Sequence, residues 1–149
     1  MTTAFICGGT GFIGEAVVAQ LVAEGHRVQA LARSAAAVAK VRELGAEPVT
    51  GDLLVEGAWQ KAAREAEWIV HLAQPQTFGG RVSRERAETY KQDRLRMDRH
   101  LLGGLDPVKT KRIVYVAGTS YYGNLGTTPK DETATPVPRG WGPYIAPAI

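Results

Sequence analysis

Three glycines near the N-terminus recur at every third position, and their spacing is the strongest chemical signal in the chain. Gly8, Gly11 and Gly14 stand between a short apolar run typical of a strand and an amphipathic segment typical of a helix. Gly8 allows a tight turn, Gly11 a close approach of backbone to ligand, and Gly14 close packing of helix on strand. The start of such a helix offers free N–H groups and its positive dipole end to an anion. The pattern predicts a loop that holds the pyrophosphate of NAD or NADP, and a glycine-rich turn without a ligand is the alternative.

The residues that follow the second apolar run bear on the choice between these two cofactors. An acidic residue at this position binds the ribose 2′-hydroxyl of NAD. The sequence has Ala32, Arg33 and Ser34 there instead. A guanidinium group recognises phosphate through two parallel hydrogen bonds, so Arg33 favours the 2′-phosphate of NADP, with NAD still possible. The alternative is that Arg33 is an ordinary surface arginine.

Strand-like and helix-like stretches alternate through most of the chain. The expected strands are 3–8, 27–32, 47–50, 68–72 and 111–117, and the expected helices are 12–24, 35–44, 55–65 and 84–102. Ser34 is a candidate cap for the second helix. The alternation predicts an α/β fold, a Rossmann-type doubly wound parallel sheet. We expect one NAD(P)-binding domain over residues 1–149, with 119–149 as an irregular active-site loop region. The first helix is expected to have Ile13, Val17, Val18, Leu21 and Val22 on one face.

Composition restricts the class of protein. The 149 residues are 44% hydrophobic, which is enough for one compact domain with a core. The net charge of +3 is spread among residues of both signs, so no nucleic-acid partner is expected. Cys7 is the single cysteine and is interpreted as a small buried core residue. No apolar run reaches the roughly 18 residues of a membrane span. We expect a cytoplasmic protein without a signal peptide, a membrane partner or a metal site.

Residue types in and beyond the glycine loop resemble a known family. With Thr10, Phe12 and Ile13 between its glycines, the loop is similar to that of extended short-chain dehydrogenases/reductases of the NAD-dependent epimerase/dehydratase type. Further motifs in the family's order span the whole chain: Gly51-Asp52-Leu53, His71-Leu72-Ala73, Arg112-Ile113-Val114-Tyr115-Val116, Tyr121-Tyr122-Gly123-Asn124, Asp131-Glu132 and Pro136. The resemblance implies the Rossmann-type fold, here truncated relative to the full family fold, because members usually continue into a C-terminal substrate domain.

The resemblance also assigns the cofactor to particular positions. In the family, the acid after the third strand hydrogen-bonds the adenine amino group, which corresponds to Asp52. The implied cofactor-binding residues are Gly8, Thr10, Gly11, Phe12, Ile13, Gly14, Arg33, Asp52, Leu53, Leu72, Ala73, Gln74, Ala117 and Gly118. Three alternatives stay open. The first is that Asp52 caps the next helix. The second is that His71 is a packed histidine and not a catalyst, and the third is that Tyr122 packs within its own loop.

The family's catalytic residues are only partly matched. There, a Tyr-x-x-x-Lys pair and an upstream Ser or Thr handle the proton, while hydride moves to or from the nicotinamide. Tyr144 stands at the tyrosine's place, but Ala148 follows where lysine is expected, and no lysine occurs after Lys130. The Ser/Thr position aligns with Gly118, and the neighbouring Thr119 is the candidate hydroxyl. A free tyrosine has a pKa of about 10, so its ionisation at pH 7 costs on the order of 4 kcal/mol, which a nearby cation reduces. Tyr144 as a purely structural aromatic residue is the alternative.

Two prolines flank Tyr144 and bear on its surroundings. Pro143 and Pro147 disturb a helix unless one of them occupies its first turn. We therefore expect this loop to differ from that of catalytic relatives.

Three functions remain open from the sequence. The resemblance implies an oxidoreductase, NADP-linked, acting as an epimerase, dehydratase or reductase on a nucleotide sugar or a related hydroxyl or carbonyl substrate. The absent lysine favours a non-catalytic NADP-binding redox sensor or regulatory protein. A third hypothesis is an interaction module that forms a homodimer through the charged helix 84–102, for which a solvated helix face is the alternative.

Overall fold

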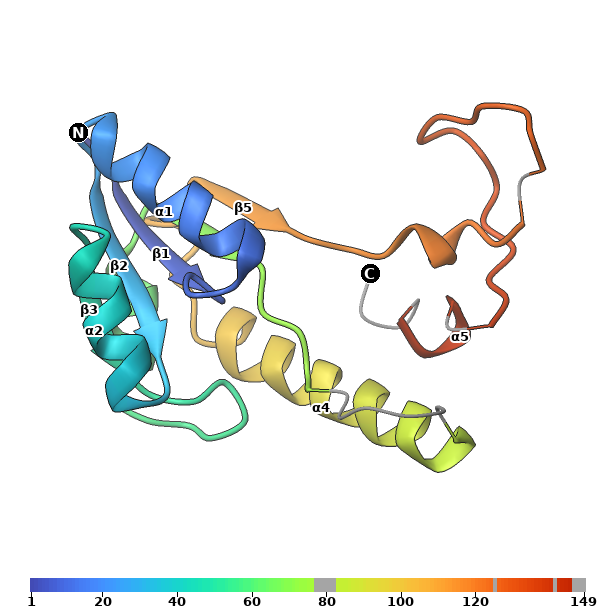
Figure 1. Cartoon of the computed structure of the whole chain (residues 1–149), viewed down its shortest axis with the longest axis horizontal. Helices are drawn as coiled ribbons and strands as arrows, with labels where there is room; N and C mark the ends of the chain where they lie inside the picture. Colours follow the sequence, from blue (N-terminus) through green and yellow to red (C-terminus); the bar gives the residue numbers. More distant parts are fainter. Residues whose placement is uncertain (77–82, 125, 141, 146–149) are drawn as a thin grey trace. The chain divides into compact units, whose positions relative to one another are not determined.

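The computed structural model divides the chain into two compact units. It describes residues 1–149 except 77–82, 125, 141 and 146–149. Residues 1–74 and 97–116 form the first unit, and residues 75–96 and 117–149 form the second. Helix α4 (Arg84–Leu102) contributes its first part to the second unit and its last turns to the first (Figure 1).

The first unit is built on a five-stranded sheet in which every neighbouring pair is parallel. Its strands are β1 (Thr3–Cys7), β2 (Arg27–Ala32), β3 (Glu47–Thr50), β4 (Trp68–His71) and β5 (Arg112–Tyr115). The helices between them are α1 (Phe12–Ala23), α2 (Ala35–Glu43) and α3 (Trp59–Glu65). The order β3-β2-β1-β4-β5 reverses direction at β1, which confirms the predicted doubly wound α/β fold.

Strand β1 is buried on both sides because its alternate residues enter two different cores. Phe5 and Cys7 pack with residues of α3 and the end of α4, whereas Ile6 packs with residues of α1 and α2. The α3/α4 core includes Leu53, Trp59, Ala63, Ile69, Met97 and Leu101. The α1/α2 core includes Val18, Val28, Ala30, Val41 and Val70. Helices therefore cover both faces of the sheet, and α1 crosses over β1 in Figure 1.

Helix α3 starts later than the sequence suggested. It begins at Trp59 and not at residue 55, because a turn closes first. The Asp52 carboxylate accepts from the Leu54 N–H at 2.9 Å, and the Asp52 carbonyl accepts from the Val55 N–H. The Gln60 side chain then accepts from the Gly57 N–H at the start of the helix. The expected start at residue 55 is therefore wrong.

Three further expectations about the first two helices can be compared with the structure. Ile13 is 54% exposed, unlike the other apolar residues assigned to the same face of α1. Val18 is fully buried, and Val17, Leu21 and Val22 pack partly against the same core. Ser34 caps α2, because its hydroxyl accepts from the Ala37 N–H at 3.2 Å.

The interpretation of Cys7 as a core residue is confirmed. Its side chain is completely buried, and burial raises the pKa of the thiol well above its usual range. A thiol in this setting stays protonated and unreactive.

Besides the first part of α4, the described residues of the second unit form two short helical segments among turns. The 3₁₀ helix η1 (Thr119–Tyr121) follows the end of the sheet, and α5 (Gly142–Ile145) packs against it. Gly142 lies so close to η1 that a Cβ there would be 2.4 Å from the Ser120 carbonyl oxygen. Pro143 occupies the first turn of α5, where a proline is tolerated.

A turn at Asp131 lies between these helical segments. The Asp131 carboxylate accepts from the backbone N–H of Thr133 at 3.0 Å and from its hydroxyl. The hydroxyl contact holds the pKa of Asp131 below its ordinary value. This residue, part of a family motif in the sequence, thus stabilises its own turn.

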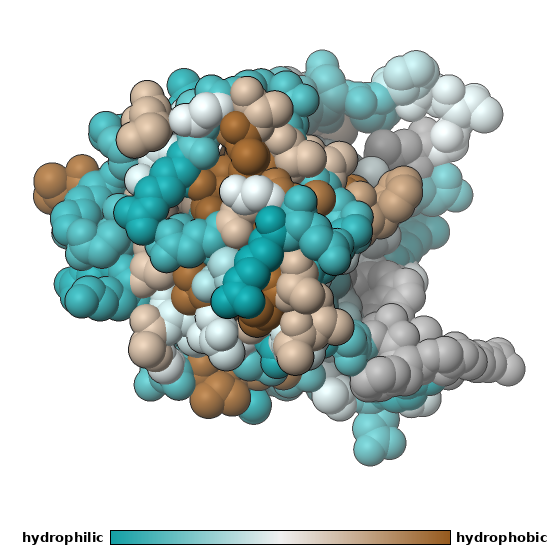
Figure 2. Space-filling model, turned by 60° about the vertical axis from the view of Figure 1, so that its left-hand side comes forward, coloured by the Kyte–Doolittle hydropathy of each residue, from teal (hydrophilic) through white to brown (hydrophobic). Residues whose placement is uncertain are grey.

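The surface mixes residue types. On the face shown in Figure 2, hydrophobic side chains are interspersed with hydrophilic ones. Strand β5 lies at one edge of the sheet, and its Ile113 and Val114 are 50% and 52% exposed. Among the described residues, no helix has both the length and the hydropathy that a membrane span requires.

The α3/α4 core gives a first prediction. Trp59 is 2% exposed, stacks on Phe5 at 6.3 Å between ring centroids, and donates from its indole N–H to the Val55 carbonyl. Because truncation leaves a large cavity, Trp59→Ala should lower the free energy of unfolding by about 3–5 kcal/mol, measured by urea denaturation. Val55→Ala, at a side chain 62% exposed, should stay within about 0.5 kcal/mol of wild type. Equal losses in the two variants would contradict this view of the core.

Candidate functional site

The glycine loop lies at the carboxyl end of the central strand. Gly8 has a φ of +83°, a conformation that side-chain-bearing residues rarely adopt, and its carbonyl accepts from the Gly11 N–H at 3.1 Å. Helix α1 begins at the next residue, Phe12. The strand order reverses at β1, and ligands of open α/β sheets bind outside the carboxyl ends of the strands at such a point.

The three glycines face different constraints. A Cβ on Gly14 would lie 2.0 Å from the Gly8 carbonyl oxygen, so helix and strand end are in direct contact. A Cβ on Gly8 would lie 2.7 Å from the backbone nitrogen of Ala73, which places the end of β4 against the loop. A Cβ on Gly11 would meet only the Gly8 oxygen, at the ordinary distance of 3.4 Å. The described residues thus require glycine at positions 8 and 14, while at position 11 they leave room for a side chain.

The start of α1 is open toward solvent. Gly11 is the N-cap residue, and no side chain caps the helix there. The first N–H groups of a helix have no partner within it, so an uncapped start can bind an anion. Phe12 is 99% exposed and Ile13 is 54% exposed, so neither side chain covers this end of the helix.

Arg33 lies at the end of β2, beside this loop in the sheet order. Ala32 before it is buried, whereas Arg33 itself is exposed. The Ser34 hydroxyl is already engaged as the cap of α2. Because parallel strands end at the same edge of the sheet, Arg33 projects from the edge that also carries the glycine loop.

Asp52 and Leu53 follow β3 at the same edge. Asp52 closes its own turn, so the alternative that it caps the next helix is wrong: that helix begins seven residues later, at Trp59. The Leu53 side chain is only 4% exposed and belongs to the α3/α4 core. The Leu53 carbonyl lies 2.8 Å from the His100 imidazole Nδ1, which ties the turn after β3 to α4.

The residues that follow β4 also lie at the carboxyl edge of the sheet. Leu72 and Ala73 are half-buried and pack against the two cores. Gln74 is exposed, and its side-chain amide donates to the Val116 carbonyl at 3.4 Å. The structure therefore brings the glycine loop, Arg33, Asp52 and the Leu72–Gln74 segment to one edge of the first unit.

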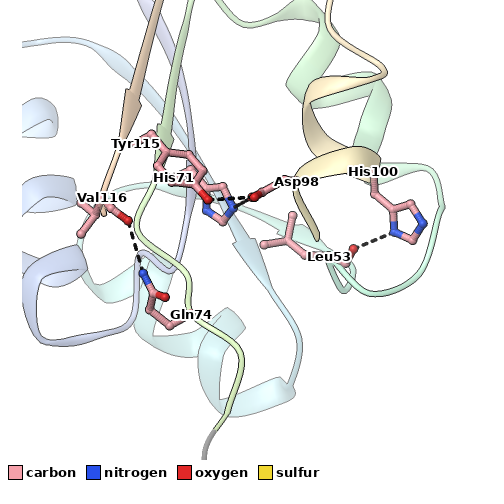
Figure 3. Close-up of polar contacts among 7 residues, drawn as sticks. All are labelled: Leu53, His71, Gln74, Asp98, His100, Tyr115 and Val116. Carbon is pink, nitrogen blue, oxygen red and sulfur yellow. Dashed lines mark hydrogen bonds and ion pairs between the residues drawn. The ribbon is translucent and has the colours of Figure 1, made fainter. Parts of the chain in front are cut away.

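Asp98, a buried carboxylate near this edge, was not singled out from the sequence. His71 is completely buried, which confirms its interpretation as a packed histidine. Its ring contacts the Asp98 carboxylate of α4, and the Tyr115 hydroxyl donates to the same carboxylate (Figure 3). The available signal was a charged residue between Met97 and Leu101, both of which belong to the buried stripe of helix 84–102.

The remaining candidate residues belong to the second unit. Ala117, Gly118 and Thr119 are exposed, and Thr119 begins η1. Tyr144 is half-buried in α5, the segment that packs on η1. Position 148, where the family has its lysine, and Pro147 lie outside the described residues.

Three other expectations from the sequence concern Tyr122, a homodimer and a metal site. Tyr122 packs edge-on against Tyr121 at 5.4 Å between ring centroids, as packing within its own loop requires. The homodimer through helix 84–102 stays a prediction. Within the described ranges, no group of three or more His, Cys, Asp or Glu side chains is arranged to hold a metal ion.

Comparison with known proteins identifies the family. The model of the NAD dependent epimerase/dehydratase family matches residues 4–146. The chain belongs to this family. A relative from Schizosaccharomyces pombe, described only as uncharacterized, is 29% identical over 138 residues, or 93% of this chain and 45% of its own. A 4-hydroxy-2-methyl-3-oxo-4-farnesyl-3,4-dihydroquinoline-1-oxide ketoreductase of Stigmatella aurantiaca is 47% identical over 69 residues, or 46% of this chain and 21% of its own.

Solved structures agree on the fold. UDP-glucose 4-epimerase from Bifidobacterium longum, solved in complex with NAD⁺ and UDP, superposes with a TM-score of 0.80 at 21% identity. The match covers 99% of this chain and 47% of that one. The matches thus span less than half the length of each of these three proteins.

Proposed function

We propose that this chain binds NADP, with NAD as the second choice, and forms the cofactor-binding part of an oxidoreductase of the epimerase/dehydratase type. The observation that carries the proposal is the room at Gly11. The described residues tolerate a side chain there, so the glycine of the motif is explained by a ligand that approaches the backbone. The uncapped start of α1 then accepts the pyrophosphate.

The proposed contacts follow the carboxyl edge of the sheet. The adenosine half lies over β1 to β3, where Arg33 meets the 2′-phosphate and Asp52 the adenine. The nicotinamide half lies over the ends of β4 and β5. The full proposed set is Gly8, Thr10, Gly11, Phe12, Ile13, Gly14, Arg33, Asp52, Leu53, Leu72, Ala73, Gln74, Ala117 and Gly118, with Leu53 acting through its backbone because its side chain is in the core.

A hydroxyl or carbonyl compound is the proposed substrate class, with a nucleotide sugar as the default. Support comes from the relatives' names, which include a ketoreductase and a UDP-glucose 4-epimerase. When bound, the cofactor supplies or accepts a hydride. Thr119 would orient the substrate oxygen and Tyr144 would exchange a proton with it. Their segments, η1 and α5, pack on each other within the second unit.

Ala148 in place of the family's lysine sets a limit on this chemistry. In the family, that lysine lowers the cost of ionising the tyrosine, and this sequence has alanine at its position. A non-catalytic NADP-binding sensor or regulator is therefore the second candidate function. The two candidates share the cofactor site and differ only in turnover.

Gly11→Ala tests the cofactor site. The backbone at Gly11 has φ −85° and ψ 172°, which alanine adopts freely, and the loss of an N-cap glycine costs about 1 kcal/mol or less. The new Cβ occupies the space proposed for the pyrophosphate, so NADPH affinity should fall about tenfold or more, which corresponds to about 1.4 kcal/mol. Fluorescence titration with NADPH measures this.

The control for this variant is Gly14→Ala. Its Cβ would lie 2.0 Å from the Gly8 oxygen, so this variant should lose stability as well as binding. If Gly11→Ala binds NADPH as wild type does, the pyrophosphate is not held at this loop.

Arg33→Ala tests the choice of cofactor. Removal of the guanidinium group should weaken NADPH by about tenfold or more and leave NADH nearly unchanged, because only NADPH carries the 2′-phosphate. Arg42→Ala, another basic residue of the same βα segment, is the matched control and should change neither affinity. Equal weakening of NADPH and NADH by Arg33→Ala would rule out the 2′-phosphate contact.

Tyr144→Phe separates the two candidate functions. The variant keeps the ring and removes the hydroxyl, so a catalytic Tyr144 requires a fall of about 10²-fold or more in kcat with NADPH affinity unchanged. The measurement is NADPH oxidation against a panel of carbonyl compounds. NADPH binding by wild type without turnover that depends on the Tyr144 hydroxyl would favour the regulator.

A further inference from the structure

Three residues lie side by side across the centre of the sheet. Cys7 pairs with His71, and His71 pairs with Tyr115, in the register of β1, β4 and β5. Each is the last residue of its strand. Because residues in one row of a parallel sheet point to the same face, all three side chains point toward the α3/α4 side, where Cys7 is already packed.

Asp98 of α4 meets two members of this row. Its Oδ1 lies 3.0 Å from the His71 Nε2, and the Tyr115 hydroxyl donates to its Oδ2 at 2.8 Å (Figure 3). The two rings contact each other edge-to-face, with centroids 5.2 Å apart. His71 is completely buried, and Asp98 is 8% exposed.

The contacts select one form of the histidine. An ionised carboxylate only accepts hydrogen bonds, so the His71 Nε2 must carry the proton that it shares with Asp98. Within the described part of the chain, the buried His71 Nδ1 has no hydrogen-bond partner. A proton on that atom would be buried without an acceptor, which favours the neutral Nε2–H tautomer.

A buried carboxylate needs an explanation other than stability. Desolvation of a charge is costly, and an apolar residue of similar size often serves a core as well or better. Its neighbours in α4, Met97 and Leu101, are the apolar residues that such a core uses. What the carboxylate adds is geometry, because it joins one helix to the last residues of two adjacent strands.

Those last residues lead directly into the segments proposed to face the nicotinamide half of the cofactor. Leu72 N–H donates to the Cys7 carbonyl at 2.9 Å, and Val116 N–H donates to the His71 carbonyl at 3.1 Å. The Gln74 side chain then links its segment to the Val116 carbonyl. The Asp98 contacts are thus made one residue before both segments leave the sheet.

We propose that Asp98 is a positioning residue for the nicotinamide half of the site: through His71 and Tyr115 it sets where the segments after β4 and β5 leave the sheet. This inference rests on the proposed cofactor function. A positioning role predicts that Asp98 affects the two halves of the cofactor site differently, which a general contribution to stability would not do. The adenosine half, over β1 to β3, should be insensitive to Asp98.

The experiment compares two ligands in three variants of the full chain. NADPH spans both halves of the proposed site, whereas 2′,5′-ADP contains only the adenosine half. Tyr115→Phe, which removes a single hydroxyl, and Asp98→Asn should weaken NADPH by about tenfold, since small displacements of positioning groups have effects of at least this size. Both should bind 2′,5′-ADP as wild type does. Asp93→Asn makes the same substitution on the same helix and should change neither.

A spectroscopic readout tests the network independently of binding. Long-range ¹H–¹⁵N correlation should show His71 as the neutral Nε2–H tautomer in wild type. In Asp98→Asn, the amide offers a donor as well as an acceptor, so the Nδ1–H tautomer should become populated.

The outcomes are distinct. Wild-type NADPH affinity in Tyr115→Phe and Asp98→Asn, or equal weakening of NADPH and 2′,5′-ADP, would overturn the positioning role while leaving the proposed cofactor site intact. An Nδ1–H tautomer in wild type would overturn the network on which the role depends. If wild type binds neither ligand, the proposed function fails, and the positioning role fails with it.

Discussion

The contact of Gly14 with the Gly8 carbonyl oxygen is the constraint on which the arrangement of the first unit depends. A Cβ at position 14 would lie 2.0 Å from that oxygen, so α1 can start where it does only if residue 14 lacks a side chain. The same turn, with Gly8 at positive φ, brings the end of β1 against Ala73 after β4. The approach of Gly14 thus fixes how close α1 begins to the end of β1, and the turn at Gly8 leaves room only for the segment after β4.

Burial of β1 on both faces is what makes this local contact part of a domain. Phe5 and Ile6 enter opposite cores, so the helices that follow must cover both sides of the sheet. The parallel strands then all end at one edge, which is where Arg33, Asp52 and Gln74 are found although they are far apart in sequence. The edge is a product of topology, and a ligand that spans it contacts several separate segments at once.

The residues proposed for catalysis lie in a different part of the chain from most of the proposed cofactor-binding residues. Thr119 and Tyr144 belong to the second unit, where η1 and α5 pack on each other around the close approach of Gly142 to Ser120. Tyr144 is present without the lysine that accompanies it in the family, and the matches to two of its relatives span less than half of their length. Family membership therefore implies a fold and a class of cofactor more firmly than it implies a reaction.

Local signals in the sequence were sufficient where residues act through their neighbours along the chain. The strands 27–32 and 47–50, the helix 84–102 and the Ser34 cap were predicted with the bounds or partner that the structure has, because apolar periodicity and capping are local properties. The predicted start of α3 was wrong because a turn at Asp52 closes before the helix begins.

By itself, then, the sequence determined the fold class, the glycine loop and the family, since these depend on spacing within short segments. Only the tertiary structure decided that Gly14 has no room for a side chain whereas Gly11 has, and that the Leu53 side chain belongs to the core. It also decided that Asp98 joins His71 to Tyr115, across separations of 27 and 17 residues. The physical reason is that strand register and helix packing set these distances, and neither is encoded in any one segment.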